Sequence, residues 1–185
     1  MRIEGTATIR APRDIVWDLL IDPNVIARCI PGCQKLEPQG DNRYAATLVV
    51  GVAAIRGTYE GTFTLSDLQP PGSYRIAFDG KGTQGFVAGT GTLTLQQQDE
   101  HTTVHYAGDI RIGGTLAAVG QRMLQSAARM MAGQFFTAIE AEAEAALKAR
   151  ETGRAAPSVR HGIVLTLLRS LRNLVRNVLR RAFKR

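Results

Sequence analysis

The sequence predicts an α+β domain in which one long helix lies over the dry face of a curved antiparallel sheet. Residues 34–112 alternate between apolar and polar side chains, as half-buried strands do, and turns such as Gln69-Pro70-Pro71-Gly72 separate the strands. Residues 116–149 carry apolar side chains at the spacing of an amphipathic helix. A sheet and a helix with one apolar face each must bury those faces together, which gives the predicted architecture.

A strand and two short helices precede this run of strands. Residues 2–10 alternate as a strand does, which brings the expected total to about seven. Pro12 suits the first turn of a helix, and Asp22-Pro23 is typical of an N-cap followed by proline at the first helical position. Pro31-Gly32 is expected to end this second short helix.

The dry face of the sheet and the apolar arc of the long helix enclose either a closed core or a ligand cavity. Met and Gly fill space loosely, which suits a cavity, yet the pattern alone fits both interpretations equally. Gln134 falls within the arc, where a buried amide would bond to backbone or to the polar head of a ligand. The expected cavity lining is Trp17, Leu48, Tyr59, Phe63, Phe78, Phe86, Tyr106, Met123, Ala127, Met131, Gln134 and Phe135.

The formal net charge of +7 comes from the C-terminal tail alone. Residues 157–185 hold eight basic residues and no acidic one, whereas residues 1–156 hold 15 basic and 16 acidic residues. Nucleic acid is therefore an unsuitable partner for the body of the protein, because phosphate binding needs a clustered basic surface. We expect a domain over residues 1–149, a flexible linker over 150–161 and a separate tail helix over 162–185.

The tail helix is predicted to lie on an anionic membrane surface. One arc is apolar and the other carries arginines, which is typical of an interfacial helix. A helix that docks in a partner's groove or bundle, and a nucleic-acid arm, are the alternatives. The expected membrane-binding residues are Leu167, Leu168, Leu171, Leu174, Val175, Val178, Arg169, Arg172, Arg176 and Arg180.

Location is predicted from the start of the chain and its cysteines. Residues 1–5 include charges and are not followed by the apolar region of a signal peptide. Two cysteines, Cys29 and Cys33, are too few for a disulfide scaffold and fit a reducing compartment. With the tail, this predicts a cytoplasmic protein held peripherally on the inner face of the cell membrane.

A series of motifs runs through residues 1–148. They are Ala11-Pro12 with Val16-Trp17, Leu20, Asp22-Pro23, Cys29-Ile30-Pro31-Gly32-Cys33, residues 64–68 with Pro70-Pro71, the glycine-rich stretch 80–91, and residues 131–136. In this order they resemble the family of the G subunit of carbon monoxide dehydrogenase.

The resemblance implies a helix-grip fold of the START-like (SRPBCC) superfamily with an apolar cavity and no catalytic centre. It also implies association with carbon monoxide dehydrogenase or a related molybdenum hydroxylase. The implied ligand is a respiratory quinone, menaquinone or ubiquinone, that accepts electrons from that enzyme. By this analogy we prefer the cavity to the closed core.

Other apparent signals of chemistry are weak. The stretch Gly80–Gly85 matches a dinucleotide-binding pattern, but it joins two predicted strands and opens no helix. The cysteines are expected to be structural, with a redox pair as the alternative, and the histidines His101, His105 and His161 show no metal-ligand spacing with them.

The sequence thus favours a non-enzymatic, membrane-associated accessory protein that binds a hydrophobic ligand for a molybdenum oxidoreductase. A recruitment adaptor without a ligand is one alternative. A cyclase-type enzyme is another, but it would need an acid–base pair on the dry face, and the sequence offers none.

Overall fold

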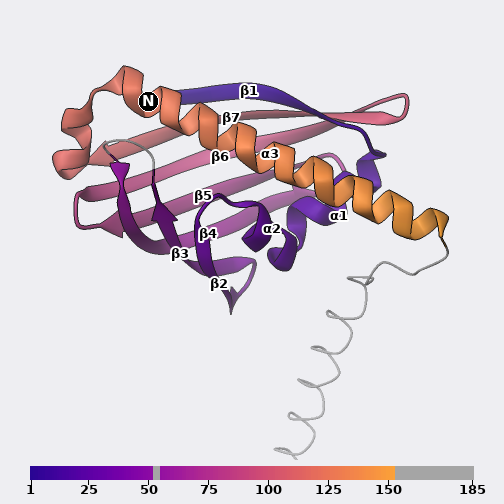
Figure 1. Cartoon of the computed structure of the whole chain (residues 1–185), viewed down its shortest axis with the longest axis horizontal. Helices are drawn as coiled ribbons and strands as arrows, with labels where there is room; N and C mark the ends of the chain where they lie inside the picture. Colours follow the sequence, from indigo (N-terminus) through magenta and orange to yellow (C-terminus); the bar gives the residue numbers. More distant parts are fainter. Residues whose placement is uncertain (52–54, 153–185) are drawn as a thin grey trace, which may run out of the picture. The chain divides into compact units, whose positions relative to one another are not determined.

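The computed structural model describes residues 1–51 and 55–152 (Figure 1). Residues Met1–Lys148 form one compact unit, and Ala149–Arg185 form a second one. Apart from its first three residues, the predicted linker and tail region lies outside the described residues. All ten expected membrane-binding residues, from Leu167 to Arg180, are among those not described, so their role stays a prediction.

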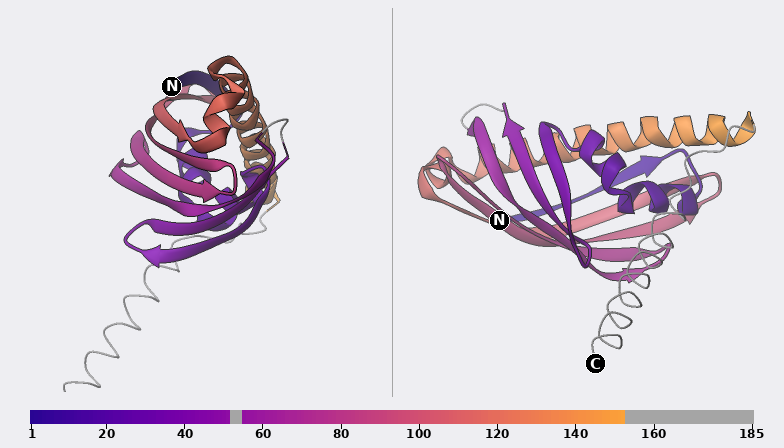
Figure 2. Two further views of the ribbon diagram at one scale, coloured as in Figure 1. Left: turned by 90° about the vertical axis from the view of Figure 1, so that its left-hand side faces the viewer. Right: turned by 90° about the horizontal axis from the view of Figure 1, so that it is seen from below.

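Seven antiparallel strands form a single sheet in the order β1-β7-β6-β5-β4-β3-β2. Strands β2 to β7 each pair with the next along the chain, and β1 pairs with β7. Their bounds are β1 Arg2–Ile9, β2 Cys33–Gly40, β3 Arg43–Val50, β4 Gly57–Gln69, β5 Ser73–Gly82, β6 Gly85–Gln98 and β7 His101–Gly113. The sheet curves around one side of the long helix (Figure 2), which confirms the predicted α+β helix-grip class.

Helices α1 (Arg13–Ile21) and α2 (Pro23–Cys29) connect β1 to β2. The N-cap of α2 is Asp22, whose Oδ1 accepts a hydrogen bond of 2.8 Å from the backbone N–H of Asn24. Pro23 follows at the first helical position, where its missing N–H leaves no intrahelical bond unmade. The predicted start of this helix is therefore correct.

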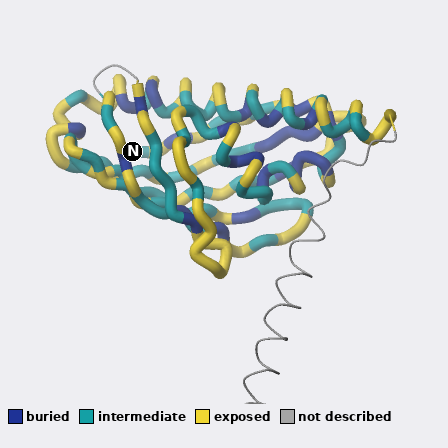
Figure 3. The backbone as a smooth tube through the Cα atoms, turned by 60° about the horizontal axis from the view of Figure 1, so that its bottom comes forward, coloured by how far each residue is buried: buried dark blue, intermediate teal, exposed yellow. Residues whose placement is uncertain are grey.

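The long helix α3 (Gln121–Glu151) lies over the concave face of the sheet (Figure 1). A single helix from residue 116 was expected, but a 3₁₀ helix, η2 (Gly114–Val119), precedes α3. Gly120 separates the two with a φ of +94°, a left-handed conformation that glycine adopts at little cost. Exposed and buried positions alternate along α3 (Figure 3), so one helix face is turned toward the sheet.

The buried apolar residues form two separate clusters. The larger joins α1, α2 and the C-terminal half of α3 to the sheet, and Leu20, Val104 and Ile139 have no exposed surface within it. The smaller lies near the start of α3 and is built on Val50, Tyr59, Leu116 and Leu124. Between the clusters the helix and the sheet are not in close contact.

Ion pairs hold the C-terminal half of α3 against the larger cluster. Arg10 contacts Glu140 at 2.8 Å and Glu144 at 3.0 Å, while Arg28 contacts Glu142 at 2.8 Å. All of these groups keep contact with solvent, which weakens the attraction within each pair, so their contribution to stability is small. They fix the position of the helix more than they stabilise the fold.

Candidate functional site

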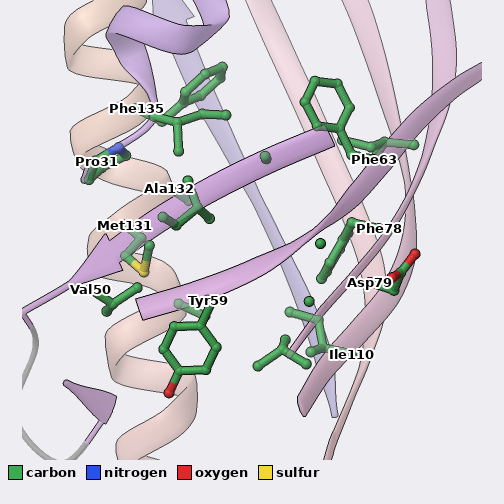
Figure 4. A pocket seen from close by; sticks show the side chains of 18 of the residues that line it. Pro31, Val50, Tyr59, Phe63, Phe78, Asp79, Ile110, Met131, Ala132 and Phe135 are labelled. Carbon is green, nitrogen blue, oxygen red and sulfur yellow. The ribbon is translucent and has the colours of Figure 1, made fainter. Parts of the chain in front are cut away.

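A cavity of about 490 Å³ lies between the concave face of the sheet and α3 (Figure 4). This volume is within the range of pockets that hold small organic ligands, roughly 300–1,000 Å³. Its walls come from the inward positions of β3 to β7, from η2 and from the side of α3 that faces the sheet. Ile26, Ile30 and Pro31 of the α2–β2 region line it as well.

Eight of the twelve expected lining residues are in the cavity wall. Tyr59, Phe63 and Phe78 project from β4 and β5, and Met131 and Phe135 project from α3 (Figure 4). The complete set is Leu48, Tyr59, Phe63, Phe78, Tyr106, Ala127, Met131 and Phe135. Their role in holding a ligand stays a prediction.

Trp17 and Phe86 were wrongly expected in the wall. Trp17 is only 4% exposed and packs edge-on against Tyr74 within the larger cluster, with ring centroids 5.8 Å apart. Phe86 is 44% exposed on the convex face. Strand β6 is continuous, so alternation counted back from Leu93 turns Val87 inward and Phe86 outward.

Met123 and Gln134 were also wrongly expected in the wall. Met123 is 51% exposed and Gln134 is exposed on the solvent side of α3. Ala127, Met131 and Phe135 of the expected arc do line the cavity, so the arc was drawn too wide on one side. Leu124 faces the cavity in place of Met123, and the exposed amide of Gln134 needs no buried partner.

Gly61 and Gly80 form part of the cavity floor, and the predicted set of lining residues did not include them. Gly61 pairs with Gly80, and the neighbouring strands continue the row with further inward glycines. Two-residue counting from Phe78 or Leu93 would have found them, because both residues face inward. The glycines at inward positions of the sheet are Gly5, Gly61, Gly80, Gly82, Gly89, Gly91 and Gly108, of which Gly61 and Gly80 line the cavity.

Aromatic rings lie over several of these glycines. A Cβ atom added to Gly89 would lie 2.8 Å from Cζ of Phe78, and one added to Gly5 would lie 2.6 Å from Cζ of Tyr106. Neither glycine can gain a side chain while its ring stays in place. Gly80 is different, because an added Cβ would meet nothing closer than 3.9 Å. The space above Gly80 is therefore open.

The cavity wall is almost free of polar side chains. Glu60 and Asp79 contribute backbone from their strands, and the exposed Asp79 carboxylate points away from the cavity (Figure 4), where it accepts a hydrogen bond of 2.8 Å from Thr62 Oγ1. Among the described wall residues there is no Lys, Arg or His. Such a site suits an uncharged ligand, because a buried charge without a partner is costly.

Tyrosine hydroxyls supply the polar atoms of the wall. Tyr59 donates to the Ile55 carbonyl at 3.4 Å, and Tyr74 donates to the Leu20 carbonyl at 3.5 Å. Burial raises the pKa of both phenols, so both stay protonated at neutral pH. Each hydroxyl has one proton, which it gives to a carbonyl, so toward a ligand it can act as an acceptor, or as a donor once that bond is broken.

The two cysteines lie beside the α2–β2 connection and are not bonded to one another. Burial raises the pKa of the Cys29 thiol to about 11, and the Glu142 carboxylate adds to this shift. Burial also raises the pKa of Cys33. Thiols with raised pKa values form little reactive thiolate at neutral pH, which favours the structural role over the redox pair.

The described residues contain no cluster of three or more His, Cys, Asp or Glu side chains placed to hold a metal ion. The stretch Gly80–Gly85 joins β5 to β6, as expected, and does not open a helix. No helix within the described residues is long and apolar enough to cross a membrane.

A curved seven-stranded sheet that grips one long helix around an apolar cavity defines the helix-grip, START-like class of proteins. Comparison with solved structures supports this fold class. Zhui aromatase/cyclase from Streptomyces sp. R1128 is 22% identical with a TM-score of 0.61, covering 81% of this chain and 97% of the other. Protein Ms6760 from Mycobacterium smegmatis is 19% identical with a TM-score of 0.56, covering 78% and 91%.

The chain belongs to the CoxG family, the family of the G subunit of carbon monoxide dehydrogenase, whose model matches residues 5–144. A conserved protein from Geobacillus kaustophilus is 34% identical with a TM-score of 0.77, covering 79% of this chain and 97% of the other. No curated protein sequence matches the chain. The family is that of an accessory subunit of carbon monoxide dehydrogenase.

Proposed function

We propose that this protein is a non-enzymatic carrier that binds a hydrophobic ligand in its cavity and links a carbon monoxide dehydrogenase-like molybdenum oxidoreductase to the membrane. The observation that carries the proposal is the cavity of about 490 Å³, which has an inward row of glycines and no cationic side chain in its described wall. An unfilled interior gives up packing contacts between side chains, but it leaves room for a bound ligand.

The proposed ligand is a respiratory quinone, menaquinone or ubiquinone. A quinone ring is flat, uncharged and carries carbonyl oxygens that accept hydrogen bonds, and its isoprenoid chain is apolar. The aromatic side chains of Tyr59, Phe63 and Phe78 offer flat contact surfaces, and the Tyr59 hydroxyl would donate to a quinone carbonyl in exchange for its long bond of 3.4 Å to the Ile55 carbonyl. The apolar faces of α3 and of the strands would contact the chain.

The absence of a catalytic role is part of the proposal. General acid–base catalysis needs a titratable group within hydrogen-bond reach of the substrate. The acidic residues nearest to the cavity, Glu60 and Asp79, are exposed, and the tyrosines keep their protons. The cyclase-type alternative, suggested by the Streptomyces neighbour, therefore has little support from the wall residues.

The partners of this carrier would be the molybdenum enzyme and an anionic membrane surface. Family membership supports the first partner. The basic, amphipathic pattern of residues 162–185 supports the second, with a peripheral location on the cytoplasmic face of the membrane. The body would take a quinone from the lipid and present it to the enzyme.

A variant that fills the cavity tests the carrier role. Gly80→Leu places a side chain in the open space above the floor without a backbone clash. Gly133→Leu is the matched control, because Gly133 is exposed on α3 and has nothing within 4 Å of an added Cβ. Both variants gain the same atoms, but only the first loses cavity volume.

The measurement is binding of menaquinone-4 by the full chain, together with native mass spectrometry and organic extraction of the purified protein. We expect the wild type and Gly133→Leu to bind, and Gly80→Leu to bind at least about tenfold more weakly, because a blocked site loses contact across a whole ligand face. Wild-type protein that neither contains nor binds an isoprenoid quinone would exclude the carrier role. Retained capture of the molybdenum enzyme by such a protein would then favour the adaptor.

A further inference from the structure

One end of the sheet is rich in glycines and contains the β5–β6 turn, and Figure 2 (left) looks onto it. Strands β3 and β7 end there and β4 and β6 begin there, because Val50 pairs with Gly57 and Phe86 with Gly113. Leu116 N–H donates to the Gln84 carbonyl at 2.8 Å, which holds η2 against the β5–β6 turn. We name this surface the glycine-rich end and define it as residues 49–51, 55–58, 80–88 and 111–126.

The segments of the glycine-rich end contain Arg56, Lys81, Arg111 and Arg122, all exposed, and no acidic residue. Acidic side chains adjoin its border, because Glu60 pairs with Lys81 and Ala88 lies between Asp79 and Arg111 in the sheet. None of the four is in an ion pair with another described residue. The body as a whole is close to neutral, so the remainder of it carries a net negative charge. The opposite end mixes charges of both signs, because acidic residues such as Asp67 and Glu142 pair there with Arg75 and Arg28.

Exposed apolar side chains accompany these charges. The large hydrophobic residues exposed in the described chain are Val49, Phe86, Met123 and Met130, and the first three belong to the glycine-rich end. Phe86 lies across Gly113 and pairs with Lys81, so an exposed ring and a cation are neighbours on the sheet. Basic residues interspersed with single apolar residues are what an anionic bilayer surface attracts.

The cavity reaches this same end. Val50, Ile55 and Leu116 belong to it and line the cavity. A ligand that left a bilayer touching the glycine-rich end would therefore have a short path to the apolar wall. The opposite end offers no such path, because Trp17, Leu20 and Ile139 fill the interior there.

We propose that the glycine-rich end of the body docks on an anionic lipid bilayer, so that the cavity faces the membrane from which it is loaded. The proposal builds on the carrier function, but it concerns a second membrane contact within the folded domain, separate from the tail. A bilayer suits this surface better than a protein does, because its charges are of one sign and its apolar residues are scattered rather than gathered in a groove.

Tryptophan fluorescence of the full chain on vesicles of brominated phosphatidylglycerol tests the orientation without any ligand. Phe86→Trp places an indole at the glycine-rich end, and His101→Trp places one in the β6–β7 hairpin at the other end. The native Trp17 is buried and supplies a constant background. We expect bromine quenching of the indole at position 86 and none at position 101. Equal quenching of both, or none at position 86, would overturn the proposal.

Charge removal gives a second, independent measurement. Arg56→Gln, Lys81→Gln and Arg122→Gln together should lower the vesicle partition coefficient of the full chain by about fivefold for each residue. Arg13→Gln, Arg43→Gln and Arg75→Gln remove the same charge elsewhere and should change it by less than about twofold. Equal losses in both triple variants would mean that only net charge matters and would contradict a docking surface.

The two proposals fail in different ways. If the wild type binds menaquinone-4 from solution but position 86 is not quenched, the carrier function stands and the docking surface is lost. If position 86 is quenched but no quinone binds, the membrane contact stands and the carrier function is lost.

Discussion

The two halves of the domain use the same sheet and the same helix but fill their interiors differently. In the packed half, α1, α2 and residues 136–147 of α3 close on inward residues such as Ile9, Leu95 and Val104. In the cavity half, residues 121–135 of α3 span a floor of glycines and leave about 490 Å³ empty. The difference shows that side-chain volume on the concave face, and not the path of the backbone, decides where this fold is solid.

The two halves of the domain are also expected to differ in their contributions, one to stability and the other to ligand binding. Leu20, Val16 and Ile139 are fully buried in the packed half, and close packing of such side chains supplies most of the stability of a domain. The wall of the cavity half lacks contact atoms on one side, so it gains less from dispersion. Stability should therefore reside in one half and ligand binding in the other.

The largest expected effect on the free energy of unfolding tests this division between the packed half and the cavity half. Leu20→Ala should lower the free energy of unfolding by about 2–5 kcal/mol, because it leaves a void in a closed core. Leu48→Ala in the cavity wall should lower it by only about 1 kcal/mol, because a void already adjoins Leu48. Urea denaturation followed by circular dichroism measures both. Equal losses would show that the cavity half is packed as tightly as the other.

A pair of glycines sharpens the comparison within the cavity floor. Gly61 and Gly80 face one another across β4 and β5, yet a Cβ at Gly61 would overlap the Asp79 carbonyl oxygen whereas one at Gly80 fits. Gly61→Ala should therefore destabilise the fold by about 1–3 kcal/mol. Gly80→Ala should be neutral or stabilise it by up to about 1 kcal/mol, because it restricts the unfolded chain. Thermal unfolding of the two variants checks this, and a reversed order would contradict the floor geometry.

The N-cap of α2 is expected to make a smaller contribution to the stability of the packed half. Asp22→Ala removes the acceptor for the Asn24 backbone N–H and should cost about 1 kcal/mol. Asp22→Asn keeps a capping oxygen and is expected to retain most of the stability. The free energy of unfolding from urea titrations distinguishes the two. A similar loss in both variants would assign the role of Asp22 to its charge instead of its hydrogen bond.

The smallest expected effect is that of the Arg28–Glu142 ion pair. Glu142→Gln should lower the free energy of unfolding by about 0.5 kcal/mol at neutral pH, because the pair is partly exposed. The hydrogen bond from Arg28 lowers the pKa of Glu142 below its ordinary value of 4.5. A lowered folded-state pKa stabilises the fold at pH values above 4.5, and this contribution is lost as the pH falls through the folded-state value.

Urea titrations of the wild type and Glu142→Gln at neutral pH and at about pH 3 measure this dependence. The difference between the two proteins should shrink in acid, because both then carry an uncharged group at position 142. A difference that stays constant or grows in acid would show that the pair does not stabilise the folded state.

Much of the architecture could be predicted from local patterns. The alternation of residues 34–112 predicts the strands, and Asp22-Pro23 marks the start of α2, because both signals act between near neighbours in the chain. Inward residues such as Tyr59, Phe63 and Phe78 follow from two-residue counting within one strand. These predictions needed no knowledge of distant contacts.

The wrong lining assignments have more than one cause. Phe86 was placed inward although continuous alternation along β6 turns it outward. Met123 and Gln134 were placed inward because the apolar arc of the long helix was drawn too wide, since Ala127 and Met131 of the same arc do line the cavity. Trp17 faces inward but packs in the larger cluster, which no pattern within one element reveals.

The sequence alone determined the order of the elements, the dry face of the sheet and the segregation of basic residues into residues 157–185, because composition and periodicity are properties of short segments. Only the tertiary structure decided between a cavity and a closed core. The same aromatic and glycine residues fit both, and the outcome depends on which glycines lie beneath which rings when seven strands are set side by side. The basic glycine-rich end likewise exists only in the folded chain, because it is assembled from four segments that are far apart in sequence.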